Sequence, residues 1–202
     1  MAIIYLHGFA SSGTSTKVDM LREHFKAKGV KVFAPDLHPD PIEVVTQITS
    51  LVRKLVSEGE RKILFVGTSM GGFYAWHASM LFDAPAVMIN PAIKPHETTA
   101  QWVGRNKNMS TGEEFEWHPG YLFSLRMMRN YVEKEQKPSQ LTVVLAMDDE
   151  LLDNKETKEF FEGTTTKLVT HETGGHRFSD FDKVIPEIEE RYNQIMPVMI
   201  DI

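Results

Sequence analysis

Short apolar runs alternate with longer helical patterns along this chain. Six runs have continuous rather than alternating hydrophobicity, which is expected of strands buried on both faces of a parallel sheet. They are rich in β-branched residues and mostly end at Gly, Pro or Asp. The predicted strands are 3–6, 31–34, 62–66, 86–90, 141–146 and 167–170.

The segments between these strands carry apolar residues at helical spacing. The clearest is 42–57, which follows Asp40 as an N-cap and Pro41 at the first helical position. The other predicted helices are 16–28, 70–81, 122–134, 155–161 and 183–195. This alternation predicts an α/β fold with a mainly parallel six-stranded sheet and helices on both faces.

The stretch 92–121 breaks the rhythm. It has no clear period, but it contains two Trp, two His, one Phe and several turn residues. Thirty residues without regular structure inside a compact domain are either functional or wrongly predicted. We expect an irregular, cap-like excursion over the carboxyl edge of the sheet, within a single domain spanning 1–202.

Composition narrows the function classes. The chain has 202 residues, 42% hydrophobic and 25% charged, as in an ordinary globular domain. A net charge of −6 with scattered basic residues disfavours nucleic acid as a partner. The absence of cysteine excludes disulfides, a catalytic thiol and Cys-based metal sites. With no signal-peptide pattern and no long apolar run, we expect a cytoplasmic protein without a membrane span.

The strongest chemical signal is the pentapeptide 67–71, Gly-Thr-Ser-Met-Gly, with Ser69 at its centre. The serine lies between a predicted strand and a predicted helix, and small residues on both sides permit a sharp turn there. The helix N-terminus then directs its amides at developing negative charge. Ser69 is therefore the candidate nucleophile, although a glycine-rich turn with an incidental serine gives the same pattern.

An oxyanion needs at least two hydrogen-bond donors. One is expected from the residue after the nucleophile, here the amide of Met70. The second is expected from the loop that follows the first strand, where the amide of Phe9 has the right place. We interpret His7, in the same loop, as a loop-shaping residue rather than a base.

A nucleophilic serine also needs a base and an orienting carboxylate. His176 lies in a glycine-flanked loop between the last strand and the last helix, so it is the candidate base. Asp149 follows the end of strand 141–146 and is the favoured acid. Asp148 remains the alternative and Asp153 a more distant one. The order serine, acid, histidine is the one expected for hydrolases of this class.

At this point the chain resembles the YqiA/YcfP-type small bacterial esterases of the α/β-hydrolase superfamily. The resemblance implies hydrolysis of acyl esters or thioesters without metal or cofactor, with Ser69, Asp149 and His176 as the triad. These proteins often have glycine where this chain has Asp148. The Asn-Pro-Ala segment at 90–92 marks the branch more than the mechanism. The matching segments are 4–9 with 11–12, 66–75, 90–95, 104–108 with 111–112, 149–153 and 174–176.

Substrate choice is less readable from the sequence. Aromatic residues of the excursion are candidates for an acyl pocket, or they simply pack the excursion onto the sheet. Those named as the pocket are Trp102, Phe115, Trp117 and Tyr121, with Phe123, Met109, Met70 and Phe9 as neighbours.

The expected partner is a small-molecule acyl ester or thioester. Lys94, Arg105 and Lys107 are candidates for holding an anionic leaving group, although such residues are more often solvated surface. The sequence gives no oligomeric state. The alternative function is a non-catalytic ligand- or partner-binding protein on the same fold.

Overall fold

The computed structural model describes residues 1–135 and 140–195. Within these residues one sheet has six strands in the order β2-β1-β3-β4-β7-β8, and every neighbouring pair is parallel. The predicted α/β class and the six predicted strands are therefore confirmed, with small shifts at the ends. The bounds are β1 (Ala2–Leu6), β2 (Lys31–Phe33), β3 (Ile63–Thr68), β4 (Ala86–Ile89), β7 (Leu141–Ala146) and β8 (Lys167–His171).

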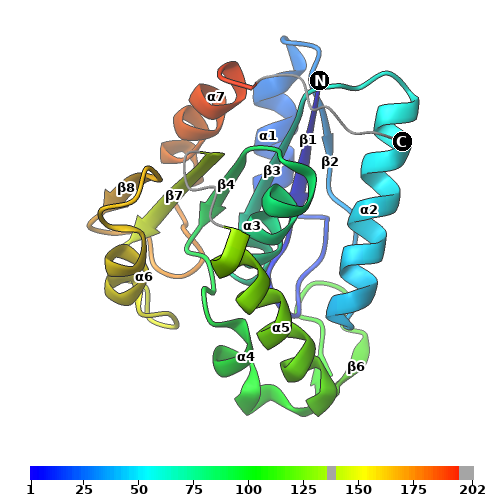
Figure 1. Ribbon diagram of the computed structural model, residues 1–202, viewed down its shortest axis with the longest axis vertical. Coiled ribbons are helices and arrows are strands. Elements are labelled where there is room, and N and C mark those ends of the chain that lie inside the picture. Colours follow the sequence, from blue (N-terminus) through cyan, green and yellow to red (C-terminus); the bar gives the residue numbers. More distant parts are fainter. Residues whose placement is uncertain (136–139, 196–202) are drawn as a thin grey trace.

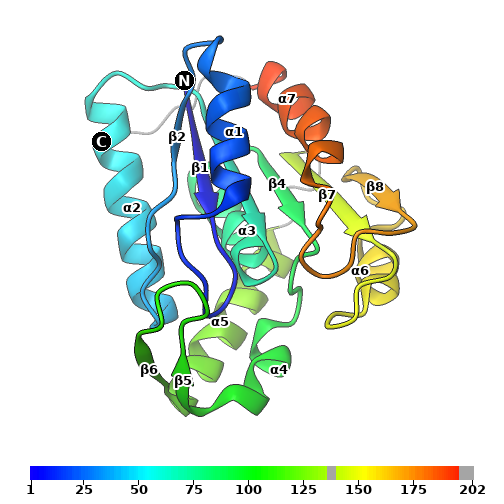
Figure 2. The same ribbon diagram turned by 180° about the vertical axis from the view of Figure 1, so that it is seen from behind.

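Helices cover both faces of this sheet (Figures 1 and 2). On one face α1 (Thr16–Lys26) and α7 (Ile185–Asn193), which follows the short turn η3 (Phe181–Lys183), pack with side chains such as Leu21 and Ile188. The other face carries a second core, which explains why the central strands are apolar on both sides. The helices that cover it are α2 (Pro41–Ser57), α3 (Met70–Phe82), α5 (Pro119–Glu135) and α6 (Asn154–Phe161).

The start of α2 shows how local sequence fixes a boundary. The side chain of Asp40 accepts a hydrogen bond from the Ile42 amide at 2.8 Å, and Pro41 occupies the first turn. Both satisfy the helix terminus as the sequence predicts, because an N-cap oxygen replaces a missing intrahelical acceptor and proline has no amide to leave unpaired.

The stretch 92–121 is not irregular throughout, so the sequence expectation is corrected there. It contains α4 (Pro95–Thr98), the turn η1 (Ala100–Trp102), and an antiparallel pair of β5 (Gly104–Lys107) and β6 (Glu114–Trp117). In β6 two glutamates point outward and two aromatic residues point inward, which is the alternation of a half-buried strand. The run is only four residues long and its partner is polar, so it gives a weak pattern.

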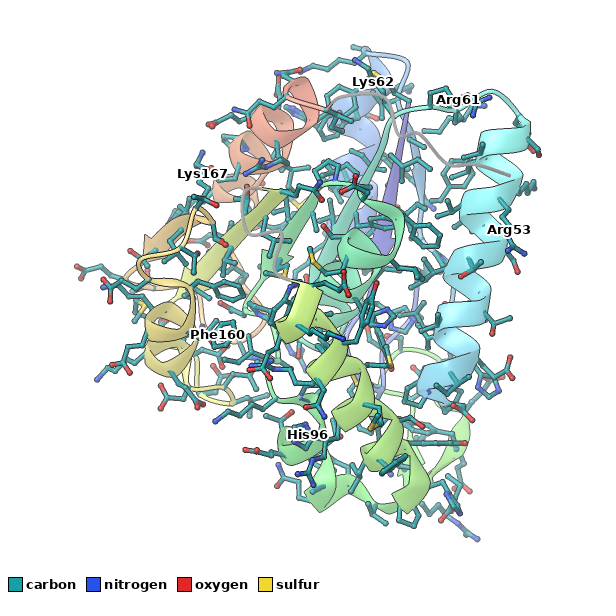
Figure 3. The ribbon with its side chains drawn as sticks, viewed as in Figure 1. Arg53, Arg61, Lys62, His96, Phe160 and Lys167 are labelled. Carbon is teal, nitrogen blue, oxygen red and sulfur yellow. The ribbon has the colours of Figure 1, made fainter. Side chains whose placement is uncertain are left out.

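The polar outer surface carries its basic residues in separate places. Figure 3 labels Arg53 on α2, Arg61 and Lys62 before β3, and Lys167 at the start of β8. In the part of the chain that the structure describes, no helix is long and apolar enough to cross a membrane.

Candidate active site

Ser69 occupies a tight turn between β3 and α3. Its φ of 57° lies in the left-handed region, which costs a non-glycine residue of the order of 1–2 kcal/mol. The turn is held by backbone hydrogen bonds. The Ser69 amide donates to the Ile89 carbonyl at 2.9 Å, and the Ser69 carbonyl accepts from Gly72 at 2.9 Å and Phe73 at 3.2 Å. The serine is therefore presented at the carboxyl end of β3 by a conformation that its surroundings enforce.

The glycines on either side of Ser69 are required by close backbone approach. A Cβ on Gly67 would lie 2.0 Å from the Gly71 carbonyl oxygen, and a Cβ on Gly71 would lie 2.0 Å from the Leu6 carbonyl oxygen. No side chain fits at such distances. The prediction that small residues are needed around the serine is confirmed, and the reason is the contact of the first turn of α3 with β1 and β3.

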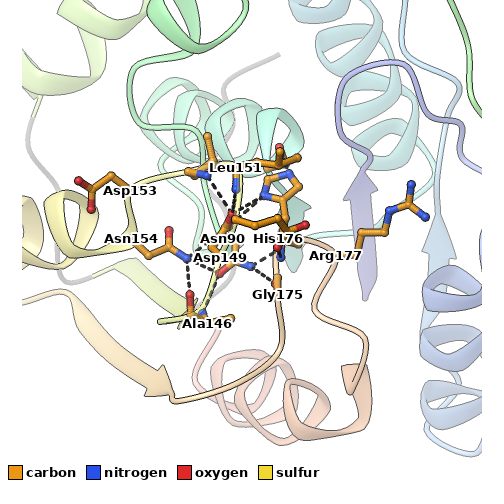
Figure 4. Close-up of polar contacts among 12 residues, drawn as sticks. Asn90, Ala146, Asp149, Leu151, Asp153, Asn154, Gly175, His176 and Arg177 are labelled. Atoms are coloured by element: carbon orange, nitrogen blue, oxygen red, sulfur yellow. Dashed lines mark hydrogen bonds and ion pairs between the residues drawn. The ribbon is translucent and has the colours of Figure 1, made fainter.

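The structure brings three of the predicted residues into one hydrogen-bonded chain, and Figure 4 labels two of them, His176 and Asp149. His176 Nε2 lies 3.0 Å from Ser69 Oγ. His176 Nδ1 lies 2.9 Å from Asp149 Oδ2 and 3.1 Å from Asp149 Oδ1. The imidazole is thus placed to accept the serine proton through Nε2 while its Nδ1–H donates to the carboxylate, which is the geometry of nucleophile, base and orienter.

The Asp149 side chain is 0% exposed and fully engaged. Its Oδ1 accepts from the amides of Leu151 and Leu152, each at 2.8 Å. Burial raises the pKa of this carboxyl, but the hydrogen bonds from His176 and from the two amides outweigh it, and the net pKa lies below the usual value. The group is therefore ionised and fixed in orientation towards His176.

The neighbouring acids have different partners. Asp148 accepts from the Gly175 amide and Glu150 from the His176 amide, each at 2.8 Å. Asp153 caps α6 by accepting from the amides of its first turn. Asp149 alone of the three predicted acids contacts the His176 ring, whereas Asp148 and Glu150 hold the backbone of the loop that carries it.

The loop after β1 lies directly against the serine. A Cβ on Gly8 would lie 3.4 Å from Ser69 Cβ, so the backbone at Gly8, the residue before Phe9, runs past the nucleophile. Among the residues that the structure describes, no acceptor is found for the backbone amides of Phe9 and Met70. Two free amides beside a serine form the kind of donor pair that stabilises an oxyanion.

His7 shapes this loop, as predicted, and takes no part in the hydrogen bonds that link Ser69, His176 and Asp149. The Leu37 amide donates to its Nε2 at 2.9 Å, so the proton is on Nδ1, which donates to the Gly8 carbonyl at 2.8 Å. Burial lowers the pKa of His7, and this keeps the ring neutral. The ring therefore links the β1 loop to the segment before α2.

A small cavity of about 60 Å³ opens beside Met70 and Phe9. Phe115 and Trp117, two of the four predicted pocket residues, line it because they are the inward positions of β6. Its other lining residues are His7, Gly8, Ala10, Ser11, Leu37, His38, Pro39, Tyr74 and Asn108.

The other two predicted pocket residues are not in the lining of this cavity. Trp102 lies in η1, is 49% exposed, and meets Phe9 only at a ring distance of 6.3 Å. Tyr121 packs behind the pocket against Trp117, with ring centroids 5.2 Å apart. Phe123, on α5, is exposed as well. The aromatic residues that line the cavity are the inward positions of β6, and the sequence pattern did not reveal this strand.

Two residues near the site, Tyr74 and Asn108, were not predicted from the sequence. Tyr74 lines the cavity from the second turn of α3, where its signal is that of an ordinary core residue. Asn108 donates from its side chain to the Ser11 carbonyl at 2.8 Å and so fastens the β5–β6 turn to the β1 loop. Both roles depend on long-range packing and have no local signature.

The three predicted cations are not gathered at the cavity. Lys94 forms an ion pair with Glu156, which favours the alternative of solvated surface for this residue. Arg105 and Lys107 are the outward positions of β5 and are exposed. Their side chains belong to the outer face of the hairpin rather than to the cavity lining.

Comparison with known structures places the fold. The model aligns with Est1E from Butyrivibrio proteoclasticus, solved with ferulic acid bound, at a TM-score of 0.73 and 17% identity, covering 94% of this chain and 86% of the other. Mouse alpha/beta hydrolase domain-containing protein 10 aligns at 0.62 and 15%, covering 96% and 90%. The thioesterase domain from the curacin biosynthetic pathway aligns at 0.63 and 14%, covering 93% and 90%. The architecture is the α/β-hydrolase fold.

Comparison of sequences places the family. The YcfP protein of Escherichia coli is 23% identical over 194 residues, covering 93% of this chain and 96% of the relative. The model of the uncharacterised protein family UPF0227 matches residues 2–191. The expected resemblance to YcfP-type proteins is confirmed. A chain with this fold, this turn at Ser69 and a family match over most of its length belongs to the uncharacterised protein family UPF0227.

Proposed function

We propose that this protein is a serine hydrolase that cleaves small carboxylic acyl esters or thioesters through an acyl-enzyme on Ser69. The observation that carries the proposal is the chain from Ser69 Oγ to His176 Nε2 at 3.0 Å and from His176 Nδ1 to Asp149 at 2.9 Å. Similar folds support it, because they include Est1E with ferulic acid bound and a thioesterase domain.

The first half of the reaction transfers the acyl group. Ser69 Oγ attacks the carbonyl carbon while His176 Nε2 accepts the hydroxyl proton, and Asp149 stabilises the imidazolium that forms. The amides of Phe9 and Met70 donate to the oxyanion, a contribution of roughly 3–4 kcal/mol for one such donor in comparable enzymes. The proton on His176 then goes to the alcohol or thiol leaving group.

The second half releases the acid. Water gives a proton to His176 Nε2 and attacks the acyl-enzyme, and the proton returns to Ser69 Oγ as the carboxylic acid departs. The cavity beside Met70 and Phe9 is the place where the acyl group would enter. Its aromatic walls, from Phe115 and Trp117, suit an apolar group.

A fluorophosphonate probe tests the nucleophile directly. We expect the wild-type protein to be labelled once, Ser69→Ala to be unlabelled, and Ser124→Ala, at a half-buried position on α5, to be labelled like the wild type. A panel of activated esters and acyl thioesters of increasing chain length then defines the acyl group.

The alternative, a non-catalytic binding protein, predicts a different result. A folded wild-type protein that neither reacts with the probe nor turns over any member of the panel would overturn the proposal. Labelling that persists in Ser69→Ala would assign the reactive group to another residue.

A further inference from the structure

Asn90, directly after β4, is fully buried and adopts a left-handed conformation with φ of 41°. It opens the Asn-Pro-Ala segment 90–92, which the sequence analysis treated only as a mark of the branch. A buried polar side chain in a strained backbone conformation calls for a physical reason, because burial and strain both oppose folding.

The Asn90 amide group has all of its hydrogen-bonding capacity used (Figure 4). Nδ2 donates to the carbonyls of Gly175 at 2.9 Å and His176 at 3.1 Å. Oδ1 accepts from the Ala146 amide at 2.8 Å and from Asn154 Nδ2 at 2.9 Å. An asparagine side chain has two donors and two acceptor sites, so this one is saturated.

These bonds join two of the loops that carry the proposed triad. The carbonyl of His176 itself is held, and Ala146 is the last residue of β7, three positions before Asp149. Asn154 extends the contact, since its Nδ2 also lies 3.4 Å from Asp149 Oδ2.

The backbone of the same segment holds the third loop. The Ser69 amide donates to the carbonyl of Ile89, the residue before Asn90, at 2.9 Å. The Ala92 amide donates to the Ser69 carbonyl at 3.1 Å. Segment 89–92 thus contacts the serine turn through its backbone and the histidine and acid loops through one side chain.

We infer that Asn90 is a positioning residue for the triad: its amide fixes the His176 loop relative to the end of β7, and so sets the distance from His176 to both Ser69 and Asp149. This inference rests on the proposed function. The physical basis is that a general base displaced by about 1 Å loses of the order of 10²-fold in rate, even when every reacting group is present.

Asn90→Asp is the sharpest test, because it keeps the shape and the acceptor but replaces both donors to the two carbonyls. We expect kcat for a reactive ester to fall about 100-fold, with KM changed less than about threefold. The low-field proton resonance of His176 Nδ1–H, assigned by its absence in His176→Ala, should shift or broaden as its contact with Asp149 is disturbed.

The chain offers a matched control in Asn106. Its Nδ2 also donates to two backbone carbonyls, those of Trp102 and Gly104, but in the β5–β6 region away from the triad. Asn106→Asp should leave kcat within about twofold and the Nδ1–H resonance unchanged. Circular dichroism and thermal unfolding show whether both variants are folded under assay conditions.

The outcomes separate this inference from the proposed function. An inactive wild type removes the proposed function. An active wild type with a folded Asn90→Asp variant of unchanged kcat and unchanged resonance overturns the positioning role alone. If Asn90→Asp does not fold, Asn90→Ser replaces it, since a hydroxyl can donate to one of the two carbonyls. Asn90→Ser should lose about 10-fold in kcat, and unchanged turnover contradicts the inference.

Discussion

The carboxyl edge around Ser69 and the excursion 92–121 are neighbours that are held in place by different kinds of contact. At the edge, buried polar groups with saturated hydrogen bonds fix the loops, as at Asn90 and Asp149. The excursion contacts the β1 loop largely through aromatic rings, with the Phe9 ring 4.9 Å from Trp117 and 5.6 Å from Phe115, and a hydrogen bond from Asn108 to the Ser11 carbonyl adds to them.

The two regions should differ in how well they tolerate substitutions. A saturated polar network fails when one donor is lost, because the partner stays buried without a bond. Aromatic packing is less directional and depends on how much of each ring is buried. We therefore expect the edge to control reactivity and the excursion to control stability and the size of the acyl group.

The largest effect should come from the acid at the edge. Asp149→Asn leaves the side-chain volume unchanged but removes the charge that orients His176, so kcat should fall about 10⁴-fold, as in comparable triads. Asp148→Asn loses the charge but keeps an oxygen that can accept from the Gly175 amide, so it should lower kcat less than about 10-fold. Steady-state ester hydrolysis measures both variants.

The two aspartates are adjacent and equal in charge, so long-range electrostatics changes similarly in the two variants. Only the contact with the His176 ring differs between them. Equal losses in the two variants, or a greater loss in Asp148→Asn, would refute the assignment of Asp149.

The next largest effect should be on stability, and the two tryptophans of the excursion allow it to be compared. Trp117 is 1% exposed and packs on Phe9, so Trp117→Ala should lower the free energy of unfolding by about 3–5 kcal/mol. It should also enlarge the cavity and favour longer acyl chains. Trp102 is 49% exposed, and Trp102→Ala should change stability by less than about 1 kcal/mol. Urea unfolding and the ester panel provide both measurements.

A Trp117→Ala variant that is as stable as Trp102→Ala would show that the excursion is not fastened by this ring. Unchanged chain-length preference, with the expected loss of stability, would instead remove β6 from the acyl pocket.

The smallest effect concerns His77. This residue lies on α3, the helix that begins at the serine turn, and it contacts Tyr131 on α5. Its ring lies 5.3 Å from that of Tyr131, and burial lowers the pKa of His77 from 6.5 to about 4. Below pH 6.5 the His77 side chain binds a proton in the unfolded chain but stays neutral in the folded chain until the pH approaches 4. Stability from this group is therefore present above pH 6.5 and is lost as the pH falls towards 4.

Urea unfolding between pH 7 and 4 measures this dependence. His77→Gln should flatten the fall in stability by up to about 1.4 kcal/mol per pH unit, less where the ring is partly solvated. His118→Gln, at an exposed position, serves as the control and should retain the wild-type slope. Identical slopes in the two variants would contradict a neutral imidazole at His77 in the folded chain.

Much of the site was predictable because its signals are local. The turn at Ser69 is marked by glycines at 67 and 71, which close backbone contact demands. His176 and Asp149 follow predicted strands, and parallel strands end at one edge of a sheet. The sequence favours Asp149 and keeps Asp148 as the alternative, because which carboxylate faces His176 depends on tertiary packing.

Other features had a signal that was too weak or was read differently. Alternation in β6 separates Phe115 and Trp117 from the outward glutamates, but four residues are too few to establish a period. Asn90 stood out in the sequence as a mark of the branch. Its partners come from positions 146, 154, 175 and 176, which are distant along the chain.

By itself the sequence determined the α/β class, the six parallel strands, the tight turn at Ser69 and the residues available for catalysis. These follow from periodicity and from steric demands between near neighbours, which are encoded locally. Only the tertiary structure decided which aspartate meets His176, which aromatics line the cavity and what Asn90 holds together. Those outcomes depend on atoms brought within hydrogen-bonding or van der Waals distance by folding, and such distances are properties of the packed chain.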